Sequence, residues 1–159
     1  MISARHEVVI DRPLEEVFAF FENHENHPKW QHTLVNHERE PLRNGARVTE
    51  IHNFLGRRVE LNGEVIDYEK NRGFGFQGQG PSVKSITYHN QFERAGEGTR
   101  VRGTIEMEPQ DMLGVARPLI EKVMQRDLEH SYTRLKDVLE LEEHATHLHR
   151  NLPKHAHQK

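Results

Sequence analysis

Residues 111–143, DMLGVARPLIEKVMQRDLEHSYTRLKDVLELEE, have the pattern of one long amphipathic helix around which the rest of the chain must pack. Apolar side chains recur at spacings of mostly three and four, which places them in one stripe along a helix. The stripe consists of Leu113, Ala116, Ile120, Val123, Met124, Leu128, Tyr132, Leu135, Val138 and Leu139. Burial of ten such side chains contributes about 15–30 kcal/mol before the opposing chain entropy is subtracted. A stripe this wide therefore requires a large apolar partner surface.

The start of this helix has two candidate positions. Asp111 suits an N-cap, because its side-chain oxygen can accept a hydrogen bond from an unpaired amide of the first turn. Pro118 lies seven residues later, where its ring would remove a donor and clash one turn back. Either the main helix begins at Arg117–Pro118 or it kinks there.

Composition limits the class of protein. A chain of 159 residues predicts one domain, and a net charge of −3 is too small to indicate a nucleic-acid partner. The absence of cysteine excludes disulfides, a thiol nucleophile and thiolate metal sites. Met1–Ile10 lacks the apolar run of a signal peptide, and no apolar stretch approaches the roughly 18 residues that cross a membrane. We expect a cytoplasmic monomer or homodimer with no membrane insertion.

The first part of the chain predicts a strand, two short helices and a second strand. Pro13 suits the first position of the first helix, because the amide N–H that proline lacks would be unpaired there. The expected elements are a strand at Arg5–Ile10, a helix from Asp11-Arg12-Pro13 onwards, a short helix or turn at Glu25–Trp30 and a strand at Thr33–Glu38.

From Arg47 the apolar period changes from 3.6 to 2, which predicts strands. Leu55-Gly56 has the length and composition of a hairpin turn, and the glycines of Gly73–Gln79 indicate bends or the close approach of a large group. The expected strands are Arg47–Phe54, Arg57–Tyr68, Gly73–Gln79, Val83–Arg94 and Thr99–Met107. Five strands with short connections form an antiparallel meander that is buried on one face.

This order of elements predicts an α+β helix-grip fold. A seven-stranded curved antiparallel sheet wraps round the C-terminal helix, and the two short helices after the first strand plug one end. Such a sheet leaves a cavity beside the helix, the usual setting of a small-molecule site. We expect one domain over residues 1–143 and a flexible, histidine-rich polar tail over residues 144–159.

Three stretches carry a resemblance to a known superfamily. They are VIDRPLEEVF at residues 9–18 with HPKW at 27–30, YEKNRGFGF at 68–76 with GTRV at 98–101, and LKDVLE at 135–140. Over Ser3–Glu143 the chain resembles the SRPBCC superfamily, also called START-like or helix-grip proteins, and within it the polyketide cyclase/dehydrase-type group. The resemblance implies a cavity for a hydrophobic ligand, with Trp30 near its mouth, and implies no particular reaction.

Nine residues are candidates for contact with a ligand between sheet and helix. For some of them the alternative is a packing role without ligand contact. Trp30 would then close the end of the sheet, and Phe76, Tyr88 and Ile105 would pack against the helix. A buried Tyr88 hydroxyl would need a polar partner, and Asn90 shares its strand face. The candidates are Trp30, Glu50, His52, Phe76, Tyr88, Asn90, Ile105, Ile120 and Met124.

Catalytic and metal sites have weaker signals. Glu50 and His52 could perform acid–base chemistry if both point inward, but Thr49 and Ile51 could equally be the inward pair. His24 and His27 have the spacing of two metal ligands on a helix, with no third ligand evident. Gly73–Gly80 lacks the lysine and the following helix of a phosphate loop. We therefore assign no catalytic residue, no metal site and no cofactor.

Three functions remain open. The first is binding of a small hydrophobic or amphipathic molecule in the cavity. The second is an enzyme similar to polyketide cyclases and dehydratases, in which polar groups of the same cavity transfer protons. The third is a protein-interaction or stress-response domain whose cavity is filled by side chains and which exposes an apolar patch.

Overall fold

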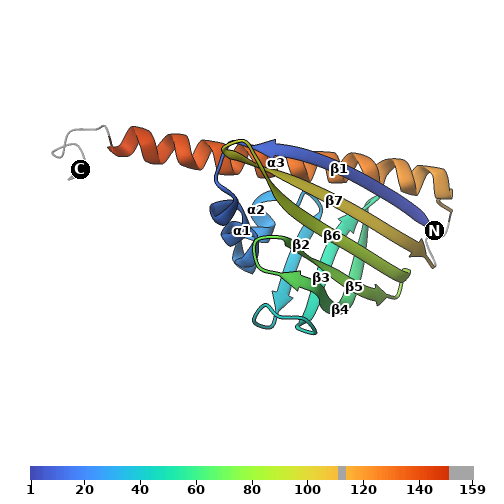
Figure 1. The fold of residues 1–159 in the computed structure, drawn as a ribbon. Helices are drawn as coiled ribbons and strands as arrows, with labels where there is room; N and C mark the ends of the chain where they lie inside the picture. The colour runs from blue at the N-terminus through green and yellow to red at the C-terminus, as the bar shows by residue number, and fades with distance from the viewer. Residues whose placement is uncertain (111–113, 151–159) are drawn as a thin grey trace, which may run out of the picture.

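The described part of the chain forms seven strands and three α-helices, with one short 3-10 helix between the first two helices (Figure 1). The computed structural model describes residues 1–110 and 114–150, with side chains as far as Leu141. The elements are β1 (Ile2–Ile10), α1 (Leu14–Glu22), η1 (His24–Asn26), α2 (His27–Trp30), β2 (Leu34–Arg39), β3 (Arg47–Phe54), β4 (Arg57–Glu69), β5 (Gly73–Gly80), β6 (Val83–Ala95), β7 (Gly98–Pro109) and α3 (Arg117–Arg150). The expected order and type of the elements are confirmed.

All seven strands belong to one antiparallel sheet in the order β1-β7-β6-β5-β4-β3-β2. The sheet curves, and α3 lies beside it along β1 (Figure 1). The β3–β4 hairpin turns at Leu55 and Gly56, whose φ angles of 52° and 71° are those of the tight turn that suits twisted strands. The predicted helix-grip fold is therefore confirmed.

The long helix begins at Arg117, so Pro118 lies in its first turn, where proline is tolerated. Asp111 and Leu113, the expected N-cap and first stripe residue, lie outside the described residues. The helix continues to Arg150, beyond the Glu143 boundary expected from the sequence. The side chains after Leu141 and all of residues 151–159 lie outside the description, so the flexible tail stays a prediction.

The apolar stripe of α3 is buried from Ile120 to Leu139. Its buried members are Ile120, Val123, Met124, Leu128, Tyr132, Leu135 and Leu139. Val138 packs against this core while only partly buried. Ala116 is exposed and precedes the helix.

Polar side chains of α3 satisfy the backbone of β1, which lies at the edge of the sheet. Gln125 accepts a hydrogen bond from the Arg5 amide at 3.0 Å and donates one to the Arg5 carbonyl at 2.8 Å. The Glu121 carboxylate accepts from the Ser3 amide, and Lys136 donates to the Val9 carbonyl. A free strand edge is a template for aggregation, so these side chains protect the edge as well as attaching the helix.

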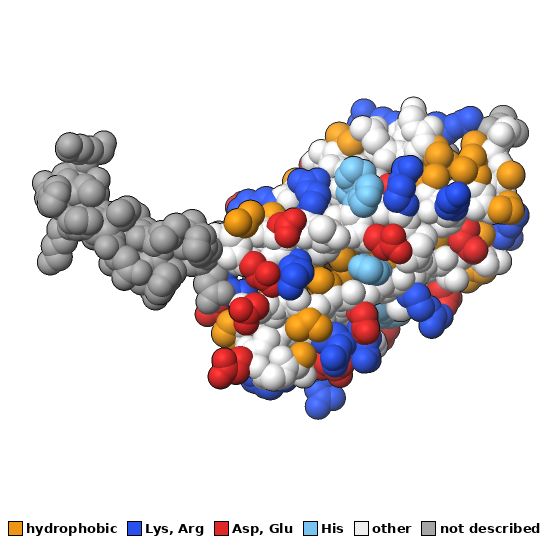
Figure 2. Space-filling view, turned by 90° about the horizontal axis from the view of Figure 1, so that it is seen from above, with side chains coloured by type: hydrophobic (Ala, Val, Ile, Leu, Met, Phe, Trp, Pro, Cys, Tyr) orange, Lys and Arg blue, Asp and Glu red, His pale blue; other side chains and the backbone are white. Residues whose placement is uncertain are grey.

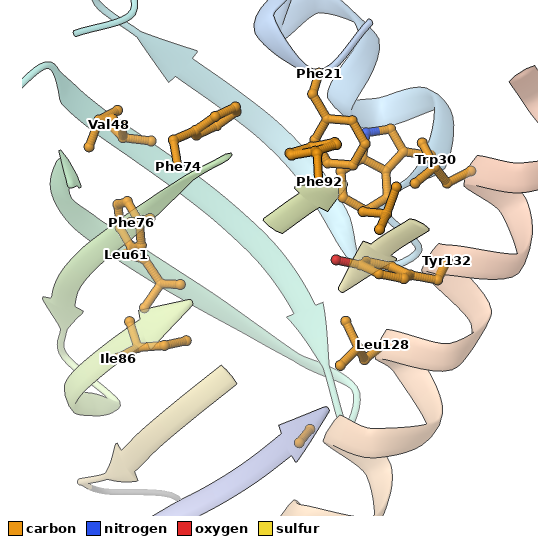
Figure 3. Close-up of a cluster of buried hydrophobic side chains, with 14 of the residues drawn as sticks. Phe21, Trp30, Val48, Leu61, Phe74, Phe76, Ile86, Phe92, Leu128 and Tyr132 are labelled. Carbon is orange, nitrogen blue, oxygen red and sulfur yellow. The ribbon is translucent and has the colours of Figure 1, made fainter. Parts of the chain in front are cut away.

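Helices α1 and α2 close one end of the sheet with aromatic side chains. The Phe21 ring lies 4.8 Å from that of Trp30 and 4.7 Å from that of Phe92, measured between centroids. Phe18 packs on Phe92 at 5.1 Å. Figure 3 shows Phe21, Phe92 and Trp30 grouped at this end, with Tyr132 of α3 beside them.

Gly103 on β7 allows Tyr132 to approach the sheet. A Cβ atom at this glycine would lie 2.2 Å from the Tyr132 hydroxyl oxygen. Only a residue without a side chain fits there, so this glycine fixes how deeply α3 sits against β7.

The surface mixes charges of both signs. Figure 2 shows acidic and basic side chains interspersed over the face seen from above, with histidines among them. Within residues 1–110 and 114–150, no helix is long and apolar enough to cross a membrane.

Candidate functional site

A cavity of about 150 Å³ lies between the concave face of the sheet and α3. Figure 3 shows Leu128 and Tyr132 projecting from α3 towards the strand side chains Leu61 and Ile86. The apolar wall includes Phe54, Val59, Leu61, Ile86, Ile105, Met107, Met124 and Leu128, and the polar lining includes Gln31, Thr33, His52, Tyr88, Asn90, Asp127 and Ser131. The interior is therefore not packed solid, which argues against the interpretation of a cavity filled by side chains.

The nine candidate residues divide into two groups. Those that line the cavity are Trp30, His52, Tyr88, Asn90, Ile105 and Met124. The Phe76 ring instead stacks on Tyr88 within the core, at 5.0 Å between centroids. Ile120 is a core residue of α3, and Glu50 is buried next to His52 and Tyr88.

Glu50 is the centre of a buried polar network. Its side chain is 0% exposed, so the inward pair on β3 is Glu50 and His52 rather than Thr49 and Ile51. Tyr88 donates its hydroxyl hydrogen to Glu50 Oε2 at 2.7 Å, and His52 Nε2 lies 3.0 Å from Oε1. His37, the cross-strand neighbour of Glu50, places Nε2 3.4 Å from Oε2. Both carboxylate oxygens are thus engaged.

These partners keep Glu50 ionised despite its burial. Burial alone would raise the pKa of Glu50. The hydrogen bonds from His52 and Tyr88, together with the electrostatic effect of the His52 and His37 rings, outweigh burial and lower this pKa to about 2. Burial and the neighbouring Glu50 raise the pKa of Tyr88 well above its usual range. Tyr88 therefore stays a neutral donor and Glu50 a charged acceptor.

His52 connects this carboxylate to a hydroxyl group on the cavity wall. Thr33 Oγ1 lies 2.8 Å from His52 Nδ1. When neutral His52 donates its Nε2–H to Glu50, its Nδ1 lone pair accepts the hydrogen of the Thr33 hydroxyl. The hydroxyl–imidazole–carboxylate chain has the components that general acid–base catalysis requires.

A second polar pair lines the cavity farther along β6. Tyr132 donates its hydroxyl hydrogen to Asn90 Oδ1, and burial raises the pKa of this phenol, which keeps it protonated. Tyr88 and Asn90 both reach the cavity, as their shared strand face predicts.

Two histidines pack behind the network. The His27 and His37 rings lie 4.5 Å apart between centroids. Burial first, and repulsion from His37 second, lower the pKa of His27 to about 3, so its ring is neutral at neutral pH. His24 and His27 gain no further ligand: within the described part of the chain, no three His, Cys, Asp or Glu side chains are placed to hold a metal ion.

Sequence reasoning missed several polar residues of this region, among them Gln31, Thr33, His37, Asp127 and Ser131. Asp127 carried a signal, because it is a carboxylate directly beside the buried stripe residue Leu128. His37 carried no comparable signal, although it pairs across the strands with Glu50. That pairing could not be read from the sequence, because the register shifts between Leu34 and Asn36.

Comparison with protein families gives a match over almost the whole chain. The family described as polyketide cyclase / dehydrase and lipid transport matches residues 1–140. The chain belongs to this family. The match covers all seven strands and most of α3, and it agrees with the resemblance noted in the sequence.

Solved structures share the fold of this chain at low identity. TTHA0849 from Thermus thermophilus is 22% identical with a TM-score of 0.75, over 85% of this chain and 94% of that one. A START superfamily protein from Mycobacterium smegmatis is 16% identical with a TM-score of 0.75, over 89% and 99%. NE0264 from Nitrosomonas europaea is 15% identical with a TM-score of 0.70, over 89% and 96%. A comparison with curated proteins finds no significant match.

Proposed function

We propose that the cavity binds a small, mainly apolar molecule that carries one or two hydrogen-bonding groups. The observation that carries the proposal is the cavity itself, with apolar walls and a polar end formed by Thr33, His52 and Tyr88. An apolar cavity with a few convergent polar groups is the usual form of a small-molecule site. Membership of a polyketide cyclase / dehydrase and lipid transport family is consistent with it.

The size of the cavity limits the ligand. A volume of about 150 Å³ is that of an apolar cavity that accommodates a single benzene ring. Sites for drug-sized ligands enclose roughly 300–1,000 Å³. We therefore favour a monocyclic aromatic or similarly sized molecule over an extended lipid chain.

Trp30 supplies the test, because it is the single tryptophan of the chain and lines the cavity. Titration with monocyclic phenols, alcohols and amines should change Trp30 fluorescence in a saturable way. Ile86→Phe adds bulk to the cavity wall and should weaken binding at least tenfold, whereas Val35→Phe on the exposed face of β2 should leave it unchanged. Absence of saturable binding across the whole panel would contradict the proposal.

A second candidate function is proton-transfer catalysis of the cyclase or dehydratase kind. The Thr33–His52–Glu50 chain favours it, because it joins a cavity hydroxyl to a buried charged acceptor. Exchange of the α-hydrogens of acetophenone in D₂O, followed by NMR, measures proton abstraction without knowledge of the natural substrate. The protein should accelerate exchange, and His52→Gln should lower the rate by about 10²-fold or more while binding persists. A rate equal to that in buffer would exclude this candidate.

A further inference from the structure

Asp127 is a carboxylate on the cavity wall, and one of its two oxygens, Oδ1, lacks a hydrogen-bond donor in the described structure. Its side chain is 13% exposed, and Oδ1 is buried with no hydrogen-bond partner in the described structure. Two cationic or titratable side chains come near: Arg126 at 3.5 Å and His32 at 3.8 Å from Oδ1. Neither makes a hydrogen bond to it. A nearly buried acceptor without a donor is unfavourable, so this carboxylate has capacity for a ligand.

The charged side chains of the described cavity lining favour a cation over an anion. Lysine and arginine are absent from the described residues that line it. Glu50 adds a second carboxylate directly behind His52. A ligand with a carboxylate or phosphate group would therefore meet repulsion at both ends of the polar lining.

We infer that the ligand is a small aromatic amine whose ammonium group pairs with Asp127. The inference rests on the proposed ligand-binding function and names the chemical class of that ligand. The ring occupies the apolar part of the cavity, and the ammonium lies beside Asp127, Ser131 and Gln31, which are the polar lining residues at the junction of α2 and α3.

Two features make an ammonium group favourable at this position. Asp127 lies near solvent, because its neighbours His32 and Arg126 have side chains that are 43% and 59% exposed. The ammonium therefore keeps part of its hydration, which reduces the cost of transfer from water. Trp30 and Tyr88 also present aromatic rings to the cavity, and aromatic faces attract cations.

Three probes with the same ring separate this inference from the proposed function. They are 2-phenylethylamine, 2-phenylethanol and phenylacetate, titrated against the unmodified protein at pH 7 with Trp30 fluorescence and calorimetry. The amine should bind at least tenfold more tightly than the alcohol, and phenylacetate should bind most weakly. Equal affinity for amine and alcohol would overturn the inference and leave the proposed function standing. Binding of none of the three would count against the proposed function.

A charge-neutral variant then assigns the selectivity to Asp127. Asp127→Asn should weaken the binding of 2-phenylethylamine at least tenfold and change the affinity for 2-phenylethanol less than twofold. Glu129→Gln makes the same charge change at an exposed position of α3 and should alter neither of the two affinities. Equal losses of affinity for the amine and the alcohol in Asp127→Asn would overturn the inference. The three-probe series in the unmodified protein decides the question even if this variant does not fold.

Discussion

Glu50 and Tyr88 meet across the interior of the sheet although β4 and β5 separate their strands. The Tyr88 hydroxyl lies 2.7 Å from Glu50 Oε2, while β3 and β6 are not neighbours in the strand order. In a flat sheet these side chains would be three strand spacings apart, roughly 14 Å at about 4.8 Å each. The contact therefore depends on the curvature that also creates the cavity.

Loss of this carboxylate should destabilise the fold. Glu50→Ala leaves the Tyr88 hydroxyl, His52 Nε2 and His37 Nε2 without their acceptor. Removing one partner from a buried charged network costs about 3–5 kcal/mol. Urea denaturation should show a loss of this size, with a smaller loss for Glu50→Gln, which keeps the shape and one acceptor oxygen.

The matched control is Glu38→Ala on β2, where the side chain is exposed. Surface substitutions of this kind usually change the free energy of unfolding by less than about 0.5 kcal/mol. A loss below about 1 kcal/mol for Glu50→Ala would contradict a structural role for the network.

His27 should make the protein sensitive to mild acid. Its pKa is lowered to about 3 by burial and by His37, whereas an unfolded histidine titrates near pH 6.5. Between these values the unfolded chain binds the extra proton, so stability is complete above about pH 6.5 and falls as the pH drops towards 3. The titration of His27 alone lowers the free energy of unfolding by at most about 1.4 kcal/mol per pH unit.

His27→Phe removes this titration and keeps an aromatic ring at the position. The free energy of unfolding should then fall less steeply between pH 6.5 and 4.5, a window above the range in which Glu50 begins to contribute. His130→Gln, at an exposed position of α3, should leave the slope as in the unmodified protein. Equal slopes for His27→Phe and the unmodified protein would show that the His27 ring is solvated.

The strands could be predicted from the sequence because their signals are local. Arg47–Phe54 is bounded as expected, since period-two alternation and the Leu55-Gly56 turn lie within a few residues of each other. The helix start at Arg117 follows from the chemistry of Pro118. These features depend on neighbouring residues and not on the tertiary structure.

The polar site could not be predicted in full, because it depends on which face of each strand turns inward. Period-two alternation on β3 is compatible with either Glu50 or Ile51 as the inward residue. Charged residues are mostly exposed, so the sequence alone favours Ile51. Only His37 and Tyr88, from other strands, make burial of Glu50 possible. Whether Phe76 lines the cavity or packs behind Tyr88 likewise depends on side-chain packing.

Gly103 should not tolerate a side chain while Tyr132 is present. In Gly103→Ala the new Cβ atom would lie 2.2 Å from the Tyr132 hydroxyl oxygen and 2.6 Å from the ring carbon that bears it. Overpacking of this kind typically costs about 1–3 kcal/mol. Tyr132→Phe in the same chain removes the nearer atom, so the double variant should lose less stability than the sum of the two single variants. Strict additivity in thermal denaturation would contradict a clash between the new Cβ atom and the Tyr132 hydroxyl.

Gln125 should protect the edge strand β1. Gln125→Ala removes both hydrogen bonds to the Arg5 backbone. The partners are exposed and water can replace them, so the global loss should be only about 0.5–1.5 kcal/mol. Hydrogen exchange is the more sensitive measurement: the Arg5 amide should exchange about tenfold faster, which corresponds to about 1.4 kcal/mol of local opening free energy.

The control for Gln125→Ala is Thr133→Ala, at an exposed position of α3 two turns further along. This change should leave the exchange rate of the Arg5 amide within twofold, because the Thr133 side chain is exposed and the hydrogen bonds to Arg5 come from Gln125. The Thr104 amide on β7 should be unaffected in both variants, since it belongs to a strand that pairs on both sides. Equal acceleration of the Arg5 and Thr104 amides in Gln125→Ala would indicate global unfolding, and would contradict a local role of Gln125 at the sheet edge.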